Sequence, residues 1–513
     1  MFFYILFPPL YTFTINFHHL LIFLFVLTPT VLLLFQWRSR RRIFPPGPRG
    51  LPFIGNLHQL GELPHRSLQH LSSIYGPLMF LQLGSIPTLI ISSADIAREL
   101  FKNFDRVFSG RPHLYGLTKL SYGCSNITSA PYGEFWKEVK KITVLELLSA
   151  KKVQSFRAVR EEELALVMSF ITTSSESGPI DLSEMLPCLV NNIVCRVTFS
   201  KKYSEVGGGK SRIDAILRDT QTLLGEFALA DFFPRLEWIH KFDGLKAKLN
   251  KIFMELDKFY DEVIEEHVKR KKLKLKPEHE DLVDVLLRIS SDPNQTITLT
   301  RDQIKGVLTD VFFAGTDASS TTVVWTMTEL IKNPKEMDKA QEEVRQILGT
   351  KDMVREEDLS QLNYLKLVIK ESMRLHPPAP LLVPRETIEN CTFHGFYIPA
   401  KTRVLVNAAA ISRDPKIWEN PGEFKPDRFL DNPIDFKGND FEFIPFGAGR
   451  RGCPGINFAI LLIELILANL LHRFDWELPH GLNREDVDME EAIGITMHKK
   501  ISLRLVANVV NVV

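Results

Sequence analysis

The sequence predicts a mainly α-helical protein with a minor β part, organised as one large body behind an N-terminal transmembrane helix. Apolar residues recur at helical spacing through much of the region between residues 94 and 375. Short β-type runs bounded by Gly and Pro lie on both sides of that region. A charge-free apolar segment near the N-terminus is the third observation. A chain of 513 residues, of which 45% are hydrophobic, can bury a large core.

The expected membrane anchor occupies residues 1–36. Residues 20–35 read LLIFLFVLTPTVLLLF without a charge, and arginines follow at positions 38, 40, 41 and 42. An apolar stretch of this length can span a hydrocarbon core of roughly 30 Å, and cations just after it favour a cytoplasmic location for that flank. A cleaved signal peptide is the alternative, but here the cations follow the apolar run. We therefore expect a single-pass protein with its body on the cytosolic side.

The remaining elements can be placed in order. Residues 37–50 form a basic, proline-rich linker, which should be extended and stiff, and residues 51–513 form the body. Strands are expected in PLMFLQLG and PTLIIS, helices over 252–268 and 304–331, and short strands again between 377 and 406. Residues 456–471 are almost entirely apolar and should form a buried helix. The glycines at 207–209 predict a surface loop. The basic run at 269–276 predicts a solvated helix end, with a nuclear or membrane signal as the alternative.

The composition excludes several classes of function. Lys and Arg number 63 against 62 acidic residues, so a net charge of +1 gives no electrostatic basis for binding nucleic acid. Five cysteines, none in a CxxC pair, are too few and too scattered for a disulfide framework or a cysteine zinc site. Sequons at Asn126, Asn294 and Asn390 would matter only if the body were lumenal.

The strongest chemical signal is the loop FGAGRRGCPG at residues 446–455. Its glycines allow tight turns and a close approach to a flat, bulky group. Cys453 should lie just before a helix, with Pro454 in the first turn, where unpaired N–H groups lower the pKa of a thiol. Arg451 offers a cation to a nearby carboxylate. The loop therefore suits an anionic sulfur ligand beside an anionic cofactor.

This loop resembles the FxxGxRxCxG signature of the cytochrome P-450 family at Phe446, Gly449, Arg451, Cys453 and Gly455. The resemblance extends from the apolar N-terminus to the tail DVDMEEAIGIT, and in texture it is closest to the plant microsomal branch of specialised metabolism. It implies the cytochrome P-450 fold, haem b (iron protoporphyrin IX) as cofactor, and Cys453 as the axial ligand of the iron. It also implies a location in the endoplasmic reticulum membrane.

Further motifs of the family can be carried over to single residues. Glu371 and Arg374 in KESMRLHPP, with Arg428 in PDRF, resemble a triad that forms a buried structural network. Trp136 and Lys140 match a WxxxR element that binds a haem propionate, with lysine in place of arginine. Arg385 matches another propionate-binding position.

The segment AGTDAS at residues 314–319 resembles the oxygen-activation motif (A/G)GxDT. Gly315 is expected to let the helix bend or open, and Asp317 is the acid of the usual acid–alcohol pair. Ala318 stands where the alcohol is expected, and the hydroxyls of Ser319 and Ser320 should point away from that face. Either the substrate supplies the missing polar group, or the enzyme tolerates reduced coupling of NADPH use to product formation.

The resemblance implies an O2-dependent monooxygenase that hydroxylates, epoxidises or oxidatively couples a small lipophilic substrate such as a terpenoid, alkaloid or phenolic. Its mostly apolar pocket is expected from residues 111–126, 228–233, 311–318, 379–383 and 493–496. Electrons should come from NADPH–cytochrome reductase, steered by Lys137, Lys140, Lys141 and Arg450. An oxygen-independent isomerase or dehydratase, and a haem-binding scaffold without turnover, are the alternatives.

Overall fold

The computed structural model describes residues 43–205, 211–273, 280–293, 297–492 and 494–510. The chain forms two units, Met1–Pro45 with Glu389–Ala400, and Pro46–Ile388 with Lys401–Val513. The expected anchor at 1–36, most of the linker and the glycines at 207–209 lie outside the described residues. The expectation of one large body applies to the second unit alone.

Helices dominate the larger unit, as predicted. Its α-helices are α2 (Pro64–Tyr75), α3 (Ala94–Lys102), α4 (Tyr115–Leu120), α5 (Glu134–Thr143), α6 (Ala150–Ser155), α7 (Arg157–Ser174), α8 (Leu182–Phe199), α9 (Arg212–Gly225), α10 (Leu245–Lys272), α11 (Leu282–Ser291), α12 (Arg301–Lys332), α13 (Pro334–Leu348), α14 (Asn363–Leu375), α15 (Ala408–Ile411) and α16 (Ile456–Arg473). Shorter 3-10 helices are η1 (Leu57–Gln59), η3 (Ser175–Ser177), η4 (Leu229–Asp231), η5 (Pro234–Lys241), η6 (Leu359–Gln361), η7 (Pro426–Phe429), η8 (Gly449–Arg451) and η9 (Arg484–Asp486), and η2 (Val144–Leu148) is π-helical. The helices expected over 252–268 and 304–331 are confirmed within α10 and α12.

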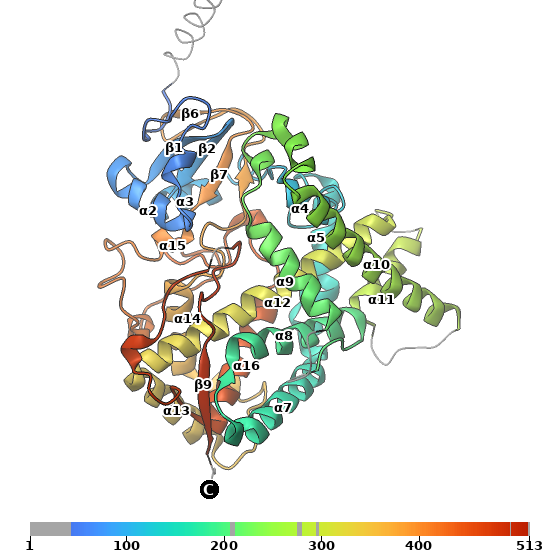
Figure 1. The fold of residues 1–513 in the computed structure, drawn as a ribbon, viewed down its shortest axis with the longest axis vertical. Coiled ribbons are helices and arrows are strands. Elements are labelled where there is room, and N and C mark those ends of the chain that lie inside the picture. The colour runs from blue at the N-terminus through green and yellow to red at the C-terminus, as the bar shows by residue number, and fades with distance from the viewer. Residues whose placement is uncertain (1–42, 206–210, 274–279, 294–296, 493, 511–513) are drawn as a thin grey trace, which may run out of the picture. The chain divides into compact units, whose positions relative to one another are not determined.

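Two sheets accompany these helices. One has the order β1-β2-β7-β4, formed by β1 (Leu78–Leu83), β2 (Ile86–Ile91), β7 (Arg403–Val406) and β4 (Arg385–Glu386). The other has the order β3-β9-β8, formed by β3 (Ile180–Asp181), β9 (Arg504–Val509) and β8 (Phe474–Glu477). Figure 1 shows the first sheet combining early strands in blue with late ones in orange, because β2 pairs in parallel with β7. The strands expected in PLMFLQLG and PTLIIS are confirmed.

Helix α12 runs through the middle of the helical part of this unit (Figure 1) and packs against α8 and α16. Its start is fixed by a capping box, in which the side chains of Thr300 and Gln303 satisfy each other's backbone N–H groups. From Ser319 to Ile331 every residue is buried, as expected of a central helix. Between residues 310 and 318 one face is at least partly accessible, and Ala314 on that face is exposed. This face of α12 therefore borders open space.

Helix α16 confirms the expected buried helix after the cysteine loop. It is the one helix among the described residues that is long and apolar enough to cross a membrane, and 61% of that stretch is buried inside the protein. Core packing therefore explains its composition.

The smaller unit contains a hairpin of β5 (Cys391–Phe393) and β6 (Phe396–Ile398), paired antiparallel. The N–H of Tyr397 donates to the carbonyl of Ile43 at 2.8 Å, so the end of the linker region lies alongside this hairpin.

Candidate active site

The cysteine loop is held in one conformation by its own backbone. The N–H of Cys453 donates to the carbonyl of Phe446 at 2.9 Å, and the N–H of Gly455 donates to the Cys453 sulfur at 3.4 Å. Gly449 has a φ of +69°, and a Cβ there would lie 2.5 Å from Oδ1 of Asp105, so only glycine fits. Helix α16 begins at Ile456 with Gly455 as its N-cap, so the expectation that Pro454 lies in the first turn is wrong by two residues.

Cys453 is an exposed residue, but enough protein atoms surround its thiol to desolvate it, and these surroundings are here called the recess. Burial raises the pKa of this thiol, while the Gly455 N–H and the charge of Lys140 lower it, and the net direction is upward. The expectation that the helix end lowers the pKa is therefore wrong in its net sign, because desolvation outweighs two favourable contacts. The positive charge of a bound metal ion would stabilise the thiolate in this recess.

Four cations gather beside this recess from separate parts of the chain: Arg111, Lys140, Arg385 and Arg451. The Lys140 ammonium donates to the carbonyl of Arg450 at 2.5 Å, which joins α5 to the cysteine loop. Burial, followed by the charge of Arg385, lowers the pKa of Arg451 to about 10. Burial, followed by the charge of Arg451, lowers the pKa of Lys140.

Arg385 is the cation of this cluster that has a carboxylate partner at close range. It forms an ion pair with Asp105 at 3.0 Å, and its other terminal nitrogen donates to the carbonyl of Ala448 at 2.9 Å. Asp105 also accepts the N–H of Arg450 at 2.9 Å. Asp105 thus ties the expected propionate cation to the cysteine loop, a role that no sequence motif indicated.

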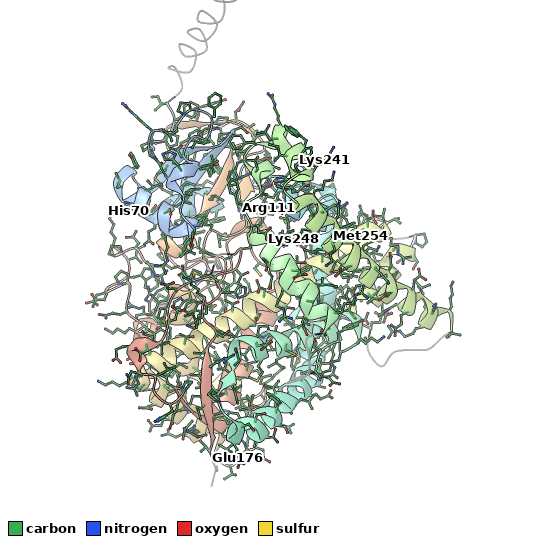
Figure 2. All side chains as sticks on the ribbon, viewed as in Figure 1. His70, Arg111, Glu176, Lys241, Lys248 and Met254 are labelled. Carbon is green, nitrogen blue, oxygen red and sulfur yellow. The ribbon has the colours of Figure 1, made fainter. Side chains whose placement is uncertain are left out.

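Arg111 is the member of this cluster that the sequence did not single out as a cofactor ligand. Its Nε donates to the carbonyl of Thr128 at 2.9 Å and its Nη1 to those of Val383 and Pro384 at 2.7 and 2.8 Å. Burial and the charges of Arg385 and Arg451 lower its pKa well below the ordinary value. Figure 2 labels Arg111 within the larger unit. Its segment was expected to line the substrate pocket, and nothing in the sequence separates it from an ordinary exposed arginine.

The buried like charges of this cluster repel one another and would be stabilised by a dianion. A haem group carries two propionates, so the cluster and the thiol recess together fit haem.

Trp136 is bonded to the loop that precedes α5. Its indole N–H donates to the carbonyl of Ile127 at 2.9 Å, and its predicted contact with a haem propionate stays a prediction. The ring instead supports two cations of the cluster, with the Arg451 guanidinium 4.2 Å and the Lys140 ammonium 5.3 Å from its centroid. Trp136 therefore orients the cations.

The predicted triad of Glu371, Arg374 and Arg428 is assembled in the structure. Two nitrogens of Arg374 bind the two carboxylate oxygens of Glu371 at 2.7 and 2.9 Å, and Nε of Arg428 binds Glu371 at 2.8 Å. Arg374 also donates to the carbonyls of Ser412 and Pro421. Because these buried groups satisfy one another and several backbone carbonyls, the triad is a structural network that joins α14 to the segment before the cysteine loop.

Gly315 has a packing role that the sequence did not indicate. Helix α12 continues as an α-helix through this residue, and the bend or opening expected at Gly315 stays a prediction. A Cβ at this position would lie 3.2 Å from a methyl group of Val194 on α8. The glycine therefore allows α12 and α8 to approach closely.

Asp317 and Ala318 lie on the partly accessible stretch of α12, and the hydroxyls of Ser320 and Thr322 on this helix are both bonded to backbone carbonyls. Ser320 donates to the carbonyls of Thr316 and Asp317, as expected for a side chain that points away. The hydroxyl of Thr322 donates to the carbonyl of Ala318 at 2.9 Å. Asp317 is instead 2.9 Å from Nε2 of His498.

Asp310, one turn before Ala314, fixes the loop that faces α12. Its carboxylate accepts the side-chain N–H of Asn126 at 2.7 Å and the backbone N–H groups of Ile127 and Thr128 at 2.6 and 3.0 Å. Burial raises the pKa of Asp310 to about 6, although these hydrogen bonds oppose the shift. The predicted pocket segments around residues 111–126, 311–318 and 379–383 are thereby joined through Asp310 and Arg111.

Comparison with known proteins agrees with this site. The family model described as Cytochrome P450 matches residues 45–504. The chain is 61% identical over 470 residues to "Cytochrome P450 71A9" of Glycine max, covering 91% of this chain and 94% of that protein. It is 58% identical to "Strychnine-11-hydroxylase" of Strychnos nux-vomica, covering 90% and 91%, and 46% identical to "Phenylacetaldehyde oxime monooxygenase CYP71AN24" of Prunus mume, covering 91% and 90%. The chain therefore belongs to the cytochrome P450 family, and it is a haem-dependent monooxygenase that uses O2, a redox partner and a small-molecule substrate.

Proposed function

We propose that this protein oxidises a small lipophilic specialised metabolite, with Cys453 as the axial thiolate of haem b. The observation that carries the proposal is the recess itself, in which an accessible sulfur lies beside four cations and accepts the backbone N–H of Gly455. When bound, the haem supplies the oxygen-activating redox chemistry, and a thiolate ligand favours cleavage of the O–O bond. Arg111, Lys140, Arg385 and Arg451 would hold its propionates, while Trp136 orients two of them.

In this proposal the residues of α12 act at the oxygen and the substrate, while the cysteine loop and the four cations hold the haem. Asp317 is the acid that holds a proton next to the reacting oxygen, and Ala318 leaves space where a hydroxyl would stand. Ala314, exposed on the same face, adds no polar group. The triad of Glu371, Arg374 and Arg428 contributes through the position of the cysteine loop and does not contact substrate.

Two observations support a small lipophilic metabolite as the substrate: the side chains on the accessible face of α12, and the names of similar proteins. The accessible face of α12 consists mainly of apolar side chains, so it favours a lipophilic molecule. One relative is named for hydroxylation of strychnine and another for oxidation of phenylacetaldehyde oxime, both small plant nitrogen compounds. Terpenoids, alkaloids and phenolics all fit these observations.

NADPH–cytochrome reductase is the proposed electron donor. Lys137 and Lys141 lie on α5, the helix whose Lys140 contacts the cysteine loop, and both are exposed. Each is paired with a glutamate of the same helix, and because such exposed ion pairs are weak, an acidic partner can compete for the two lysines. Together with Arg450 they form a cationic face suited to an acidic partner.

Membrane attachment is proposed through residues 1–36 and a second surface, here called the apolar rim. The apolar rim comprises the exposed side chains Leu51, Phe53, Phe227, Trp238 and Phe242. Its parts are adjacent, because Gly84 donates to the carbonyl of Ile54 at 3.1 Å and Ser85 to that of Phe232 at 2.8 Å. Lys241, labelled in Figure 2 on the green segment, follows Trp238 closely in sequence. Aromatic groups beside a cation suit the membrane interface of the endoplasmic reticulum.

The test is the spectrum of the reduced protein with carbon monoxide. A band near 450 nm is expected, and Cys453→His should abolish it, since thiolate ligation is its cause. The matched control Cys391→Ser, far from the loop in sequence, should leave the band unchanged. Persistence of the band in Cys453→His would overturn the proposed ligation. NADPH-dependent product formation with a reductase, screened over lipophilic compounds by mass spectrometry, then identifies the substrate.

A further inference from the structure

The segment before β9 places a histidine against α12. Nε2 of His498 lies 2.9 Å from Oδ1 of Asp317, and Nδ1 lies 3.0 Å from the hydroxyl of Thr321. Asp317 and Thr321 are four residues apart on α12 and therefore share a face. The imidazole thus bridges two successive turns of the helix, from the acid that precedes Ala318 to Thr321.

The backbone around His498 is held in place from several sides. The N–H of Met497 donates to the carbonyl of Pro378 at 2.9 Å, and the indole N–H of Trp325 donates to the carbonyl of Met497 at 2.6 Å. The N–H of Ala492 donates to the carbonyl of His498 at 2.8 Å. These contacts fix the ring against α12.

The two ring nitrogens have different partners. Nδ1–H of His498 can donate to the hydroxyl of Thr321, and Nε2 is the ring nitrogen that faces the carboxylate of Asp317. Burial lowers the pKa of His498, but the hydrogen bond and charge of Asp317 raise it more, so the net direction is upward. On its own segment, Lys499 bonds to the carbonyl of Asp488 and Lys500 pairs with Glu490, so neither cation competes for Asp317.

We propose that His498 supplies protons to Asp317, and that Thr321 positions the ring for this transfer. The proton on Nε2 passes to Oδ1 of Asp317, which leaves a neutral imidazole and a carboxylic acid. Because 37% of the His498 side chain is exposed, water then returns a proton to Nε2. The transfer involves no oxidation or reduction. Protons would then reach the site through His498 and Asp317, without the alcohol at residue 318 that would otherwise assist their delivery.

This inference rests on the proposed place of Asp317 at the oxygen site. His498 is a positioning and proton-supplying residue that acts through Asp317 and does not contact the reacting atoms. It also gives a third explanation for Ala318, beside a substrate hydroxyl and reduced coupling.

The first test measures the pair without turnover. Full-length, haem-loaded protein is melted at pH 6 and pH 9, as the unmodified chain and as His498→Gln, Asp317→Asn and the double variant. Since the folded pKa of His498 is raised, the stabilisation is present below about pH 6.5 and is lost as pH rises through the folded pKa. The unmodified chain should exceed Asp317→Asn in Tm by about 1–3 °C more at pH 6 than at pH 9. Equal differences at both pH values would show that His498 is not charged beside Asp317.

The second test separates proton supply from structure. The probe is a 7-alkoxycoumarin that the unmodified enzyme O-dealkylates with NADPH and reductase. His498→Gln should lower product per NADPH roughly tenfold or more, and coupling in the unmodified enzyme should fall as pH rises while the variant stays flat. An organic hydroperoxide brings its own proton, so product formed with cumene hydroperoxide should be equal in both. Thr321→Val should lower coupling less, and Thr328→Val, a buried threonine whose hydroxyl donates to Val324, should leave it unchanged.

The outcomes distinguish this inference from the proposed function. If the 450 nm band is absent from the unmodified chain, the haem–thiolate proposal fails, and the inference about His498, which rests on it, is overturned with it. If His498→Gln keeps both the band and the coupling, the pair is structural and the inference is overturned. If cumene hydroperoxide turnover falls as much as NADPH turnover, His498 affects the pocket and not proton supply, which also overturns it.

Discussion

At the scale of single residues, Ala318 and Arg111 show how one side chain can redirect the chemistry of a site. Ala318 leaves the proposed oxygen-facing surface of α12 without the hydroxyl that the family motif predicts. Its carbonyl is occupied by the hydroxyl of Thr322, so that threonine cannot turn toward the site without breaking this bond. Arg111 adds a cation to a cluster in which burial, followed by the charges of Arg385 and Arg451, lowers its pKa. The effect of Ala318 therefore depends on the bonding of Thr322, and the effect of Arg111 depends on the neighbouring cations.

Ala318→Thr tests whether the missing alcohol matters. A substrate with a polar group near the reacting carbon should be crowded by threonine, so turnover of that substrate should fall severalfold and selectivity should shift. Proton supply through His498 predicts that product per NADPH does not rise generally. The measurement is coupling over a panel of substrates with and without such a group. A uniform rise in coupling would show that Ala318 is only a tolerated loss.

At the scale of elements, α12 positions the site because it approaches its neighbours at glycines. Gly315 lies against Val194 of α8, and Gly306 lies against the backbone of the loop that leads to Asn126. That loop is bonded to Asp310 on the same helix. The close approach and the hydrogen bonds together fix how the loop faces the accessible stretch of α12.

Gly306→Ala should therefore destabilise the fold. The added Cβ would lie 2.6 Å from the backbone oxygen of Ser125, which can move only if the loop moves. We expect a loss of about 1–3 kcal/mol in the free energy of unfolding, despite the better helix propensity of alanine. Gly422→Ala is the matched control, since a Cβ there has open space around it, and it should change stability by less than about 1 kcal/mol. Equal unfolding curves for the two variants would contradict the close approach.

At the scale of the whole molecule, the site in the larger unit is formed by segments from both the N-terminal and the C-terminal parts of the chain. Strand β2 pairs with β7, Asp105 pairs with Arg385, and Arg451 donates to the carbonyls of Ser109 and Ala130. The proposed anchor and the apolar rim would direct this unit to a membrane.

Deleting residues 1–36 should weaken membrane association and leave the 450 nm band intact, since the anchor and the catalytic unit are proposed to be separate. The apolar rim should retain a residual association that falls further in Trp238→Ser. Fractionation of the expressing cells measures both effects. The sequons should stay unoccupied, and Asn126 in particular is buried and bonded to Asp310. Glycan on the exposed Asn390 would place the body in the lumen and contradict the proposed orientation.

The sequence by itself determined the parts whose information is local. Helical periodicity predicted α10, α12 and α16, alternating short runs predicted β1 and β2, and a contiguous ten-residue motif placed Cys453 before a helix. It also predicted the triad, because ExxR and PDRF are short patterns. Each of these depends on residues close in sequence, or on a motif whose spacing is itself the signal.

Only the tertiary structure decided what depends on distant contacts. Arg111, Asp105 and His498 gain their roles from neighbours up to 345 residues away, as for Arg450 and Asp105, and no local pattern marks them. The expected effect of the helix end on the Cys453 pKa was wrong in its net sign for the same reason. Desolvation is a property of the folded environment, and it outweighs the local tendency of the loop that carries the thiol.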